Sequence, residues 1–172
     1  VDCPWREQAQ WWGDARVQFK VCAYAFGDVS LLERGIRQVG QSQAADGALH
    51  AHPPSDARNA YLPDYMMTWV GTLWDHYFHT GNPTLARECL PVLHRLFEFF
   101  AAHENSEGLV GGFDGFWVFL DWQELYKQDF SGVLNLMYLQ ALRWAAAICQ
   151  VLDQEKDAER YNDKATALAE VI

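Results

Sequence analysis

The strongest constraint on the fold is an alternation of short and long links between helical segments. Six segments carry apolar residues at the i, i+3, i+4 spacing of an amphipathic helix. They are predicted at about residues 14–26, 29–45, 63–80, 83–104, 131–152 and 155–172. Two or three residues join the first helix to the second, the third to the fourth and the fifth to the sixth (Gly27-Asp28, Gly81-Asn82-Pro83 and Asp153-Gln154). These links are typical of αα-hairpin turns, so the sequence predicts an all-α fold of three helical hairpins.

The links between the hairpins are long, at about residues 46–62 and 105–130. Long loops inside a compact helical domain usually carry function. Both long links and the opening segment precede an odd-numbered helix. Because successive helices alternate in direction, all odd-numbered helices begin at the same end of the stack. We therefore expect all three irregular segments at the same end of the helical stack, which we interpret as the functional face.

Four local features are predicted for the helices and loops. Asp14 is a plausible N-cap of the first helix, and Pro83 is suited to the first position of the fourth. A short strand is possible only around residues 116–120. The residues that share one apolar face of the first helix are Val17, Val21 and Ala25.

The composition and charge exclude some classes of binding partner and favour another. The net charge is −10 and the isoelectric point is about 4.9, without a basic stripe, which argues against nucleic acid or an anionic membrane as a partner. Eight tryptophans beside many carboxylates suit a neutral polyhydroxylated ligand instead. The oligomeric state is left open.

The cysteines and histidines give no sign of a metal site. Cys3, Cys22, Cys89 and Cys149 are irregularly spaced without a CxxC pair, so reduced thiols are favoured over disulfides. Reduced thiols would slightly favour the cytoplasm, but localisation is otherwise open. The pair His50-Ala-His52 lacks a further ligand at metal-site spacing, and we expect neither a metal nor another cofactor.

The opening segment, residues 2–14, has the richest chemistry. It reads Asp-Cys-Pro-Trp-Arg-Glu-Gln-Ala-Gln-Trp-Trp-Gly-Asp, with three aspartate or glutamate residues, one arginine and three indoles but no helical or strand period. Carboxylic acids protonate glycosidic oxygens, arginine braces carboxylates, and indole faces stack on pyranose rings. The alternative is a loop whose tryptophans plug the end of the helical core.

The two long loops have similar content. The first carries His50, His52, Asp56, Arg58 and Tyr61 before Pro63-Asp64, and the second carries Asp114, Trp117, Asp121, Trp122 and Glu124. We expect Trp117 and Phe119 to pack on the core while Asp121 and Trp122 point to the site.

Asp2-Cys-Pro-x-Arg-Glu7, followed by Trp-x-Gly-Asp14, resembles the catalytic-domain signature of the family 78 α-L-rhamnosidases. Other stretches are similar to that family as well. They are residues 41–43 (Gln-Ser-Gln), 52–54 (His-Pro-Pro), 62–64 (Leu-Pro-Asp), 73–77 (Leu-Trp-Asp-His-Tyr), 80–82 (Thr-Gly-Asn) and 121–122 (Asp-Trp), together with Trp69. The resemblance implies that residues 1–172 are part of an (α/α)6 toroid, with about three of its six hairpins present.

The resemblance also implies roles for single residues. Glu7 matches the general acid of an inverting hydrolysis of terminal α-L-rhamnosides, although aligning Gln8 there is an alternative. Asp2, Arg6 and Asp14 match residues that bind rhamnose hydroxyls, and Trp11 matches an aromatic wall. The acidic and stacking positions of the next two loops are matched by Asp64, Asp121 and Trp122. The family's general base would lie beyond residue 172, so this fragment alone would be inactive.

Two other functions stay open at this stage. A different six-hairpin glycosidase, such as a glucosidase or a trehalase-like enzyme, would use the same aromatic and acidic loops. A carbohydrate-binding or scaffold module without turnover is the other alternative. Asp121 or Glu124 could also be considered as a base within this chain. The expected partner is a rhamnose-containing carbohydrate or glycoside.

Overall fold

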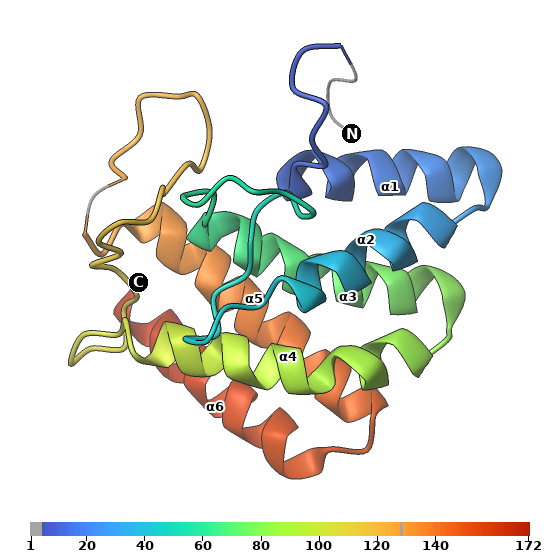
Figure 1. Ribbon diagram of the computed structural model, residues 1–172. Helices are drawn as coiled ribbons and strands as arrows, with labels where there is room; N and C mark the ends of the chain where they lie inside the picture. Colours follow the sequence, from blue (N-terminus) through green and yellow to red (C-terminus); the bar gives the residue numbers. More distant parts are fainter. Residues whose placement is uncertain (1–4, 128) are drawn as a thin grey trace.

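The computed structural model describes residues 5–127 and 129–172 and is all-α, as predicted (Figure 1). The six helices are α1 (Trp12–Phe26), α2 (Ser30–Gln41), α3 (Pro63–Thr80), α4 (Thr84–Ala101), α5 (Gly132–Val151) and α6 (Glu155–Val171). Across these two ranges the only β pairing is an isolated antiparallel bridge between Glu104 and Val110. The segment around residues 116–120, where a strand was considered, is a loop.

The three predicted hairpins are confirmed, and a glycine in the left-handed conformation ends the first helix of two of them, α1 and α3. Gly27 and Gly81 both have φ of 65°, and their amides donate to the carbonyls of Ala23 and Tyr77. A residue without a Cβ adopts this conformation at little cost, so each glycine stops its helix and lets the chain reverse. Figure 1 shows these tight links at one end of the stack and the long loops, 42–62 and 102–131, at the other.

Helix α3 occupies the centre of the molecule and packs against α1, α2, α4 and α5, while α6 packs on α5. Its buried positions lie on all sides of the helix, as expected for a helix that is apolar all round. They include Met66, Met67, Trp69, Val70 and Leu73. The first turn of α3 therefore sits at the loop end of the core.

Two predictions for α1 are wrong. Its supposed inward face is exposed, at 66% for Val17 and 61% for Val21, because the helix buries Trp12 and Phe19 instead. Helical spacing identifies residues that share a face but not the neighbour that covers them. Asp14 lies in the first helical turn rather than at the N-cap, which is Trp11.

A third correction concerns the start of α4. Pro83 occupies the N-cap position, one residue earlier than predicted, and its carbonyl accepts the amide of Arg87. The hairpin turn is otherwise as expected from the Gly-Asn-Pro sequence.

The cysteines within the described ranges, Cys22, Cys89 and Cys149, are free. Cys3 lies outside those ranges. Over the same part of the chain, none of the helices combines the length and the apolar character needed to cross a membrane.

Arg16 joins three helices at one point. Its guanidinium donates to Asp75 of α3 at 2.8 Å and lies 4.2 Å from the ring centroid of Trp144 on α5. A salt bridge and a cation–π contact thus hold α1 against the central helix. Gly71 leaves the space for both partners, because a Cβ there would lie 2.6 Å from the Trp144 ring and 2.8 Å from the Arg16 guanidinium carbon.

We predict that Gly71→Ala destabilises the protein by about 1 kcal/mol or more, because overpacking outweighs the higher helix propensity of alanine. The matched control is Gly132→Ala in the first turn of α5, where a Cβ would meet no heavy atom within 4 Å. Urea unfolding should show the control to be neutral or slightly stabilised. Equal stability changes in the two variants would contradict this packing account.

Candidate active site

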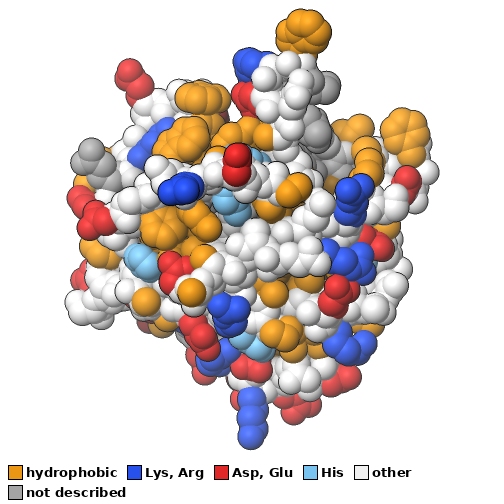
Figure 2. All heavy atoms as spheres, in the orientation of Figure 1, with side chains coloured by type: hydrophobic (Ala, Val, Ile, Leu, Met, Phe, Trp, Pro, Cys, Tyr) orange, Lys and Arg blue, Asp and Glu red, His pale blue; other side chains and the backbone are white. Residues whose placement is uncertain are grey.

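The opening segment and the two long loops converge at one end of the molecule, as predicted. The Trp12 amide donates to the Ala51 carbonyl at 2.9 Å, and the Trp117 amide donates to the Tyr61 carbonyl at 3.1 Å. These two bonds join the opening segment to loop 42–62 and that loop to loop 102–131. Hydrophobic side chains gather on the surface over this end, at the upper left of Figure 2.

Small residues let the opening motif dock closely. Trp12 is 1% exposed, and its ring covers Gly35 of α2, where a Cβ would lie only 2.8 Å from the ring. Gly13 faces Tyr65, whose ring carbon Cζ would lie 2.7 Å from a Cβ at that position. Trp12 therefore packs into the end of the helical core, as the alternative interpretation of the opening segment predicts. Its neighbour Trp11 instead lines a pocket at the surface.

A pocket of about 350 Å³ lies between the three segments. Six of the eight predicted site residues line it: Arg6, Glu7, Trp11, Asp14, Asp121 and Trp122. Leu62, Tyr65, Trp117 and Phe119 complete the lining. Of the other two predicted residues, Asp2 lies outside the described ranges, and Asp64 borders a neighbouring pocket.

Glu7 is paired with its neighbour Arg6. The Arg6 guanidinium donates to Glu7 Oε1 at 2.8 Å, and the two side chains are 73% and 33% exposed. At this exposure the pair contributes little to stability. Both side chains line the pocket. Arg6 makes at least one further interaction within the molecule.

Aromatic rings form the pocket wall. Trp11 contacts His52 at a centroid distance of 4.2 Å and Trp117 at 6.4 Å, and Trp117 contacts Trp122 at 6.3 Å. The prediction that Trp117 packs on the core is wrong, since this ring is 44% exposed and lines the pocket. Trp122 is 83% exposed, so a large indole surface is free for a flat apolar ligand face.

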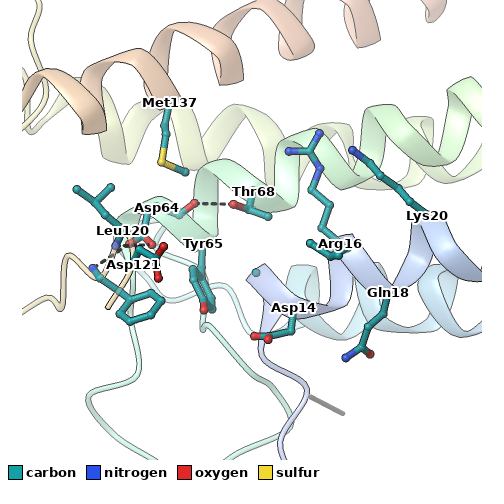
Figure 3. Close-up of a pocket in the computed structure, with 13 residues that line it drawn as sticks. Asp14, Arg16, Gln18, Lys20, Asp64, Tyr65, Thr68, Leu120, Asp121 and Met137 are labelled. Atoms are coloured by element: carbon teal, nitrogen blue, oxygen red, sulfur yellow. Dashed lines mark hydrogen bonds between the residues drawn. The ribbon is translucent and has the colours of Figure 1, made fainter. Parts of the chain in front are cut away.

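A second pocket of about 600 Å³ adjoins the first and shares Asp14, Tyr65, Phe119 and Asp121 with it. Figure 3 shows Asp14 directed toward Tyr65 at one side of this pocket. The cavity continues along α1 to Arg16 and Lys20, both of which pair with Asp75.

Asp64 is the buried carboxylate of the site. It lies in the first turn of α3, is 2% exposed, and accepts the amides of Phe119 at 3.2 Å and Leu120 at 3.1 Å (Figure 3). Burial raises its pKa from 3.8 to about 6, and the amide hydrogen bonds and the charge of Lys127 act in the opposite direction.

The histidine pair packs behind Trp11. His50 Nε2 lies 2.9 Å from the Ala57 carbonyl, and the amide of His52 donates to His50 Nδ1. Burial, with a smaller effect of His50, lowers the pKa of His52. Within the described ranges, no group of three or more His, Cys, Asp or Glu side chains could hold a metal ion.

Tyr65 is a pocket residue that the sequence reasoning missed. It lines both pockets and contacts Trp11 and Phe119 edge-on at centroid distances of 6.0 and 5.9 Å. Tyr65 lies within an apolar helical pattern, which favours a core position over a pocket position. Its place directly after Pro63-Asp64 could have indicated the pocket, because the first turn of an odd-numbered helix lies at the loop end. Asp56, Arg58 and Glu124 are exposed and line neither pocket.

Comparison with known families and structures places the chain among glycosidase domains. The model of the bacterial α-L-rhamnosidase six-hairpin glycosidase domain matches residues 1–172. No curated protein matches the sequence.

Solved structures with the same fold are much longer. A GH78 rhamnosidase of Bacillus sp. GL1 is 27% identical over the whole chain with a TM-score of 0.92, and this chain covers 18% of it. A Klebsiella oxytoca rhamnosidase with rhamnose bound is 25% identical over 97% of this chain, with a TM-score of 0.84 and 33% of its own length covered. The chain thus spans a third or less of these two proteins. Its three hairpins are consistent with part of a six-hairpin toroid.

We predict a pH-dependent stability difference between the wild type and Asp64→Asn. The folded state binds the Asp64 proton more tightly than the unfolded chain, so protonation stabilises the fold as the pH falls from about 7 towards 4. The wild type should gain about 2 kcal/mol over the asparagine variant between pH 7.5 and 4.5. Urea unfolding at both pH values measures this difference. A stability difference that is the same at both pH values, or one that shifts in favour of the variant at pH 4.5, would contradict the raised pKa of Asp64.

Proposed function

Because the chain belongs to the family of bacterial α-L-rhamnosidase six-hairpin glycosidase domains, we propose that it supplies the general-acid side of an active site that hydrolyses terminal α-L-rhamnosides with inversion. The observation that carries this proposal is that one pocket is lined by Glu7, Arg6, Asp14, Asp121 and three tryptophans. Two of the similar solved structures contain rhamnose, which supports the choice of sugar.

Glu7 is proposed as the general acid that protonates the leaving-group oxygen. It is the only glutamate that lines the pocket among the described residues, whereas Gln8, the alternative in the alignment, carries an amide and cannot donate a proton in this way. Arg6 would keep the Glu7 side chain directed into the pocket through their hydrogen bond.

The remaining pocket residues are proposed to bind the sugar. Asp14 and Asp121 present carboxylate oxygens that can accept hydrogen bonds from ring hydroxyls, as Asp2 would at the start of the motif. Trp11 and Trp122 offer indole faces against which the apolar face of a deoxy-sugar can stack. No metal or cofactor is needed for this chemistry.

We further propose that the general base comes from outside these 172 residues. Inversion needs a second carboxylate about 6.5–9.5 Å from the acid, with a water between the two. The resemblance assigns the base to a later hairpin, and this chain covers only 18% and 33% of the first two similar structures. The chain alone would then bind rhamnose without hydrolysing its glycosides.

We predict that Glu7→Gln, in the complete protein that contains this segment, lowers kcat for an aryl α-L-rhamnoside by about 10²- to 10⁴-fold, because proton donation to the leaving group is lost. The amide keeps the size of the side chain, so rhamnose binding should change little. The matched control is Glu107→Gln, an exposed glutamate that lines neither pocket. The measurement is release of the aryl group, with aryl glucosides as competing substrates.

Full activity of the Glu7→Gln protein would overturn the acid assignment. Faster release from an aryl glucoside than from the rhamnoside would favour another six-hairpin glycosidase. Sugar binding by the complete protein without any turnover would favour a non-catalytic module.

A further inference from the structure

The loop segment 116–122 forms one wall of the pocket, yet it contains no helix or strand to hold its shape. Several of its fixed points come from residues 61–65, at the end of loop 42–62 and the start of α3. The Tyr61 carbonyl accepts the amide of Trp117, the Tyr65 ring contacts Phe119, and Asp64 binds two consecutive amides.

We propose that Asp64 is a positioning residue that fixes the backbone at Phe119 and Leu120 and thereby sets Asp121 and Trp122 against the bound sugar. This inference rests on the proposed function, and it replaces the direct contact with sugar that the resemblance implied for Asp64. The carboxylate acts through the loop.

The geometry of the carboxylate supports this role. Its two oxygens each accept one amide, Oδ1 from Phe119 and Oδ2 from Leu120, so both already point at the loop. Although Asp64 borders the larger pocket, it is only 2% exposed and does not line the smaller pocket that holds Glu7. A sugar hydroxyl in that smaller pocket would meet Asp121 rather than Asp64.

The backbone of Leu120 gives a reason for the two hydrogen bonds. Its φ is 55°, a left-handed conformation that costs free energy for a residue with a Cβ. Amide hydrogen bonds to a carboxylate are stronger than neutral ones and offset this cost. The position of Asp64 in the first turn of α3 also places its charge near the positive end of the helix dipole.

Removal of the carboxylate should therefore have a local effect. Leu120 would relax to negative φ and redirect Asp121 and Trp122, which follow it directly. The bond between Trp117 and the Tyr61 carbonyl would remain, because it does not involve Asp64. The helical core would stay folded while the pocket wall moved.

The test is residue-level amide hydrogen exchange of the 172-residue chain, with Asp64→Asn and Asp64→Ala as variants. In the wild type, the amides of Phe119 and Leu120 should exchange more slowly than unstructured amides. Both should lose protection in the alanine variant, and at least one in the asparagine variant, since an amide group has a single acceptor oxygen. The α4 amides should be unchanged.

The matched control is Asp75→Asn, which removes another carboxylate of α3, one that pairs with Arg16 instead of the loop. It should leave the exchange of Phe119 and Leu120 unaltered. Fast exchange of these two amides in the wild type would overturn the proposal without any variant. Unchanged protection in Asp64→Ala, or equal loss in Asp75→Asn, would overturn it as well.

Titration with L-rhamnose separates this proposal from the proposed function. We expect Asp64→Ala to weaken rhamnose binding about tenfold or more through misplacement of the wall, while Asp75→Asn binds as the wild type does. Lost protection with unchanged rhamnose affinity would refute the positioning role. Absence of rhamnose binding in the wild type would count against the proposed function, whereas the exchange data would still decide whether Asp64 holds the loop.

Discussion

The burial of α3 on all sides is the constraint on which the rest of the structure depends. Because the helix is apolar all round, the other hairpins pack around it and its first turn is held at the loop end. The residues at that start then organise the surrounding loops: Gly13 docks against Tyr65, and Asp64 binds the amides of loop 102–131. Core packing and pocket geometry are therefore linked through residues 61–65.

The hairpin architecture could be predicted because its signals are local. A glycine that ends a helix does so through its own backbone conformation, without contacts from distant segments. The alternation of short and long links then determines which loops lie at the same end. The same reasoning predicts Glu7, Asp14 and Asp121 on one face, and they line one pocket. The roles of these residues in catalysis stay predictions, because they depend on a bound sugar.

The parts that could not be predicted depend on contacts between distant segments. The face of α1 with Val17 and Val21 has helical spacing, yet Trp12 and Phe19 are the residues that pack on the core. Tyr65 could not be predicted as a pocket residue, because its neighbours in sequence form an apolar helix. The hydrogen bonds from the amides of residues 119 and 120 to Asp64 could not be predicted either, because they depend on the conformation of the loop.

The proposed function requires that the three irregular segments form one rhamnose site around Glu7. A crystal structure of the chain with L-rhamnose would test this requirement. We expect a sugar ring between Trp11 and Trp122, with a Glu7 carboxylate oxygen about 2.6–3.2 Å from the anomeric hydroxyl oxygen. Rhamnose bound elsewhere on the molecule, or Glu7 directed away from a sugar in this pocket, would contradict it.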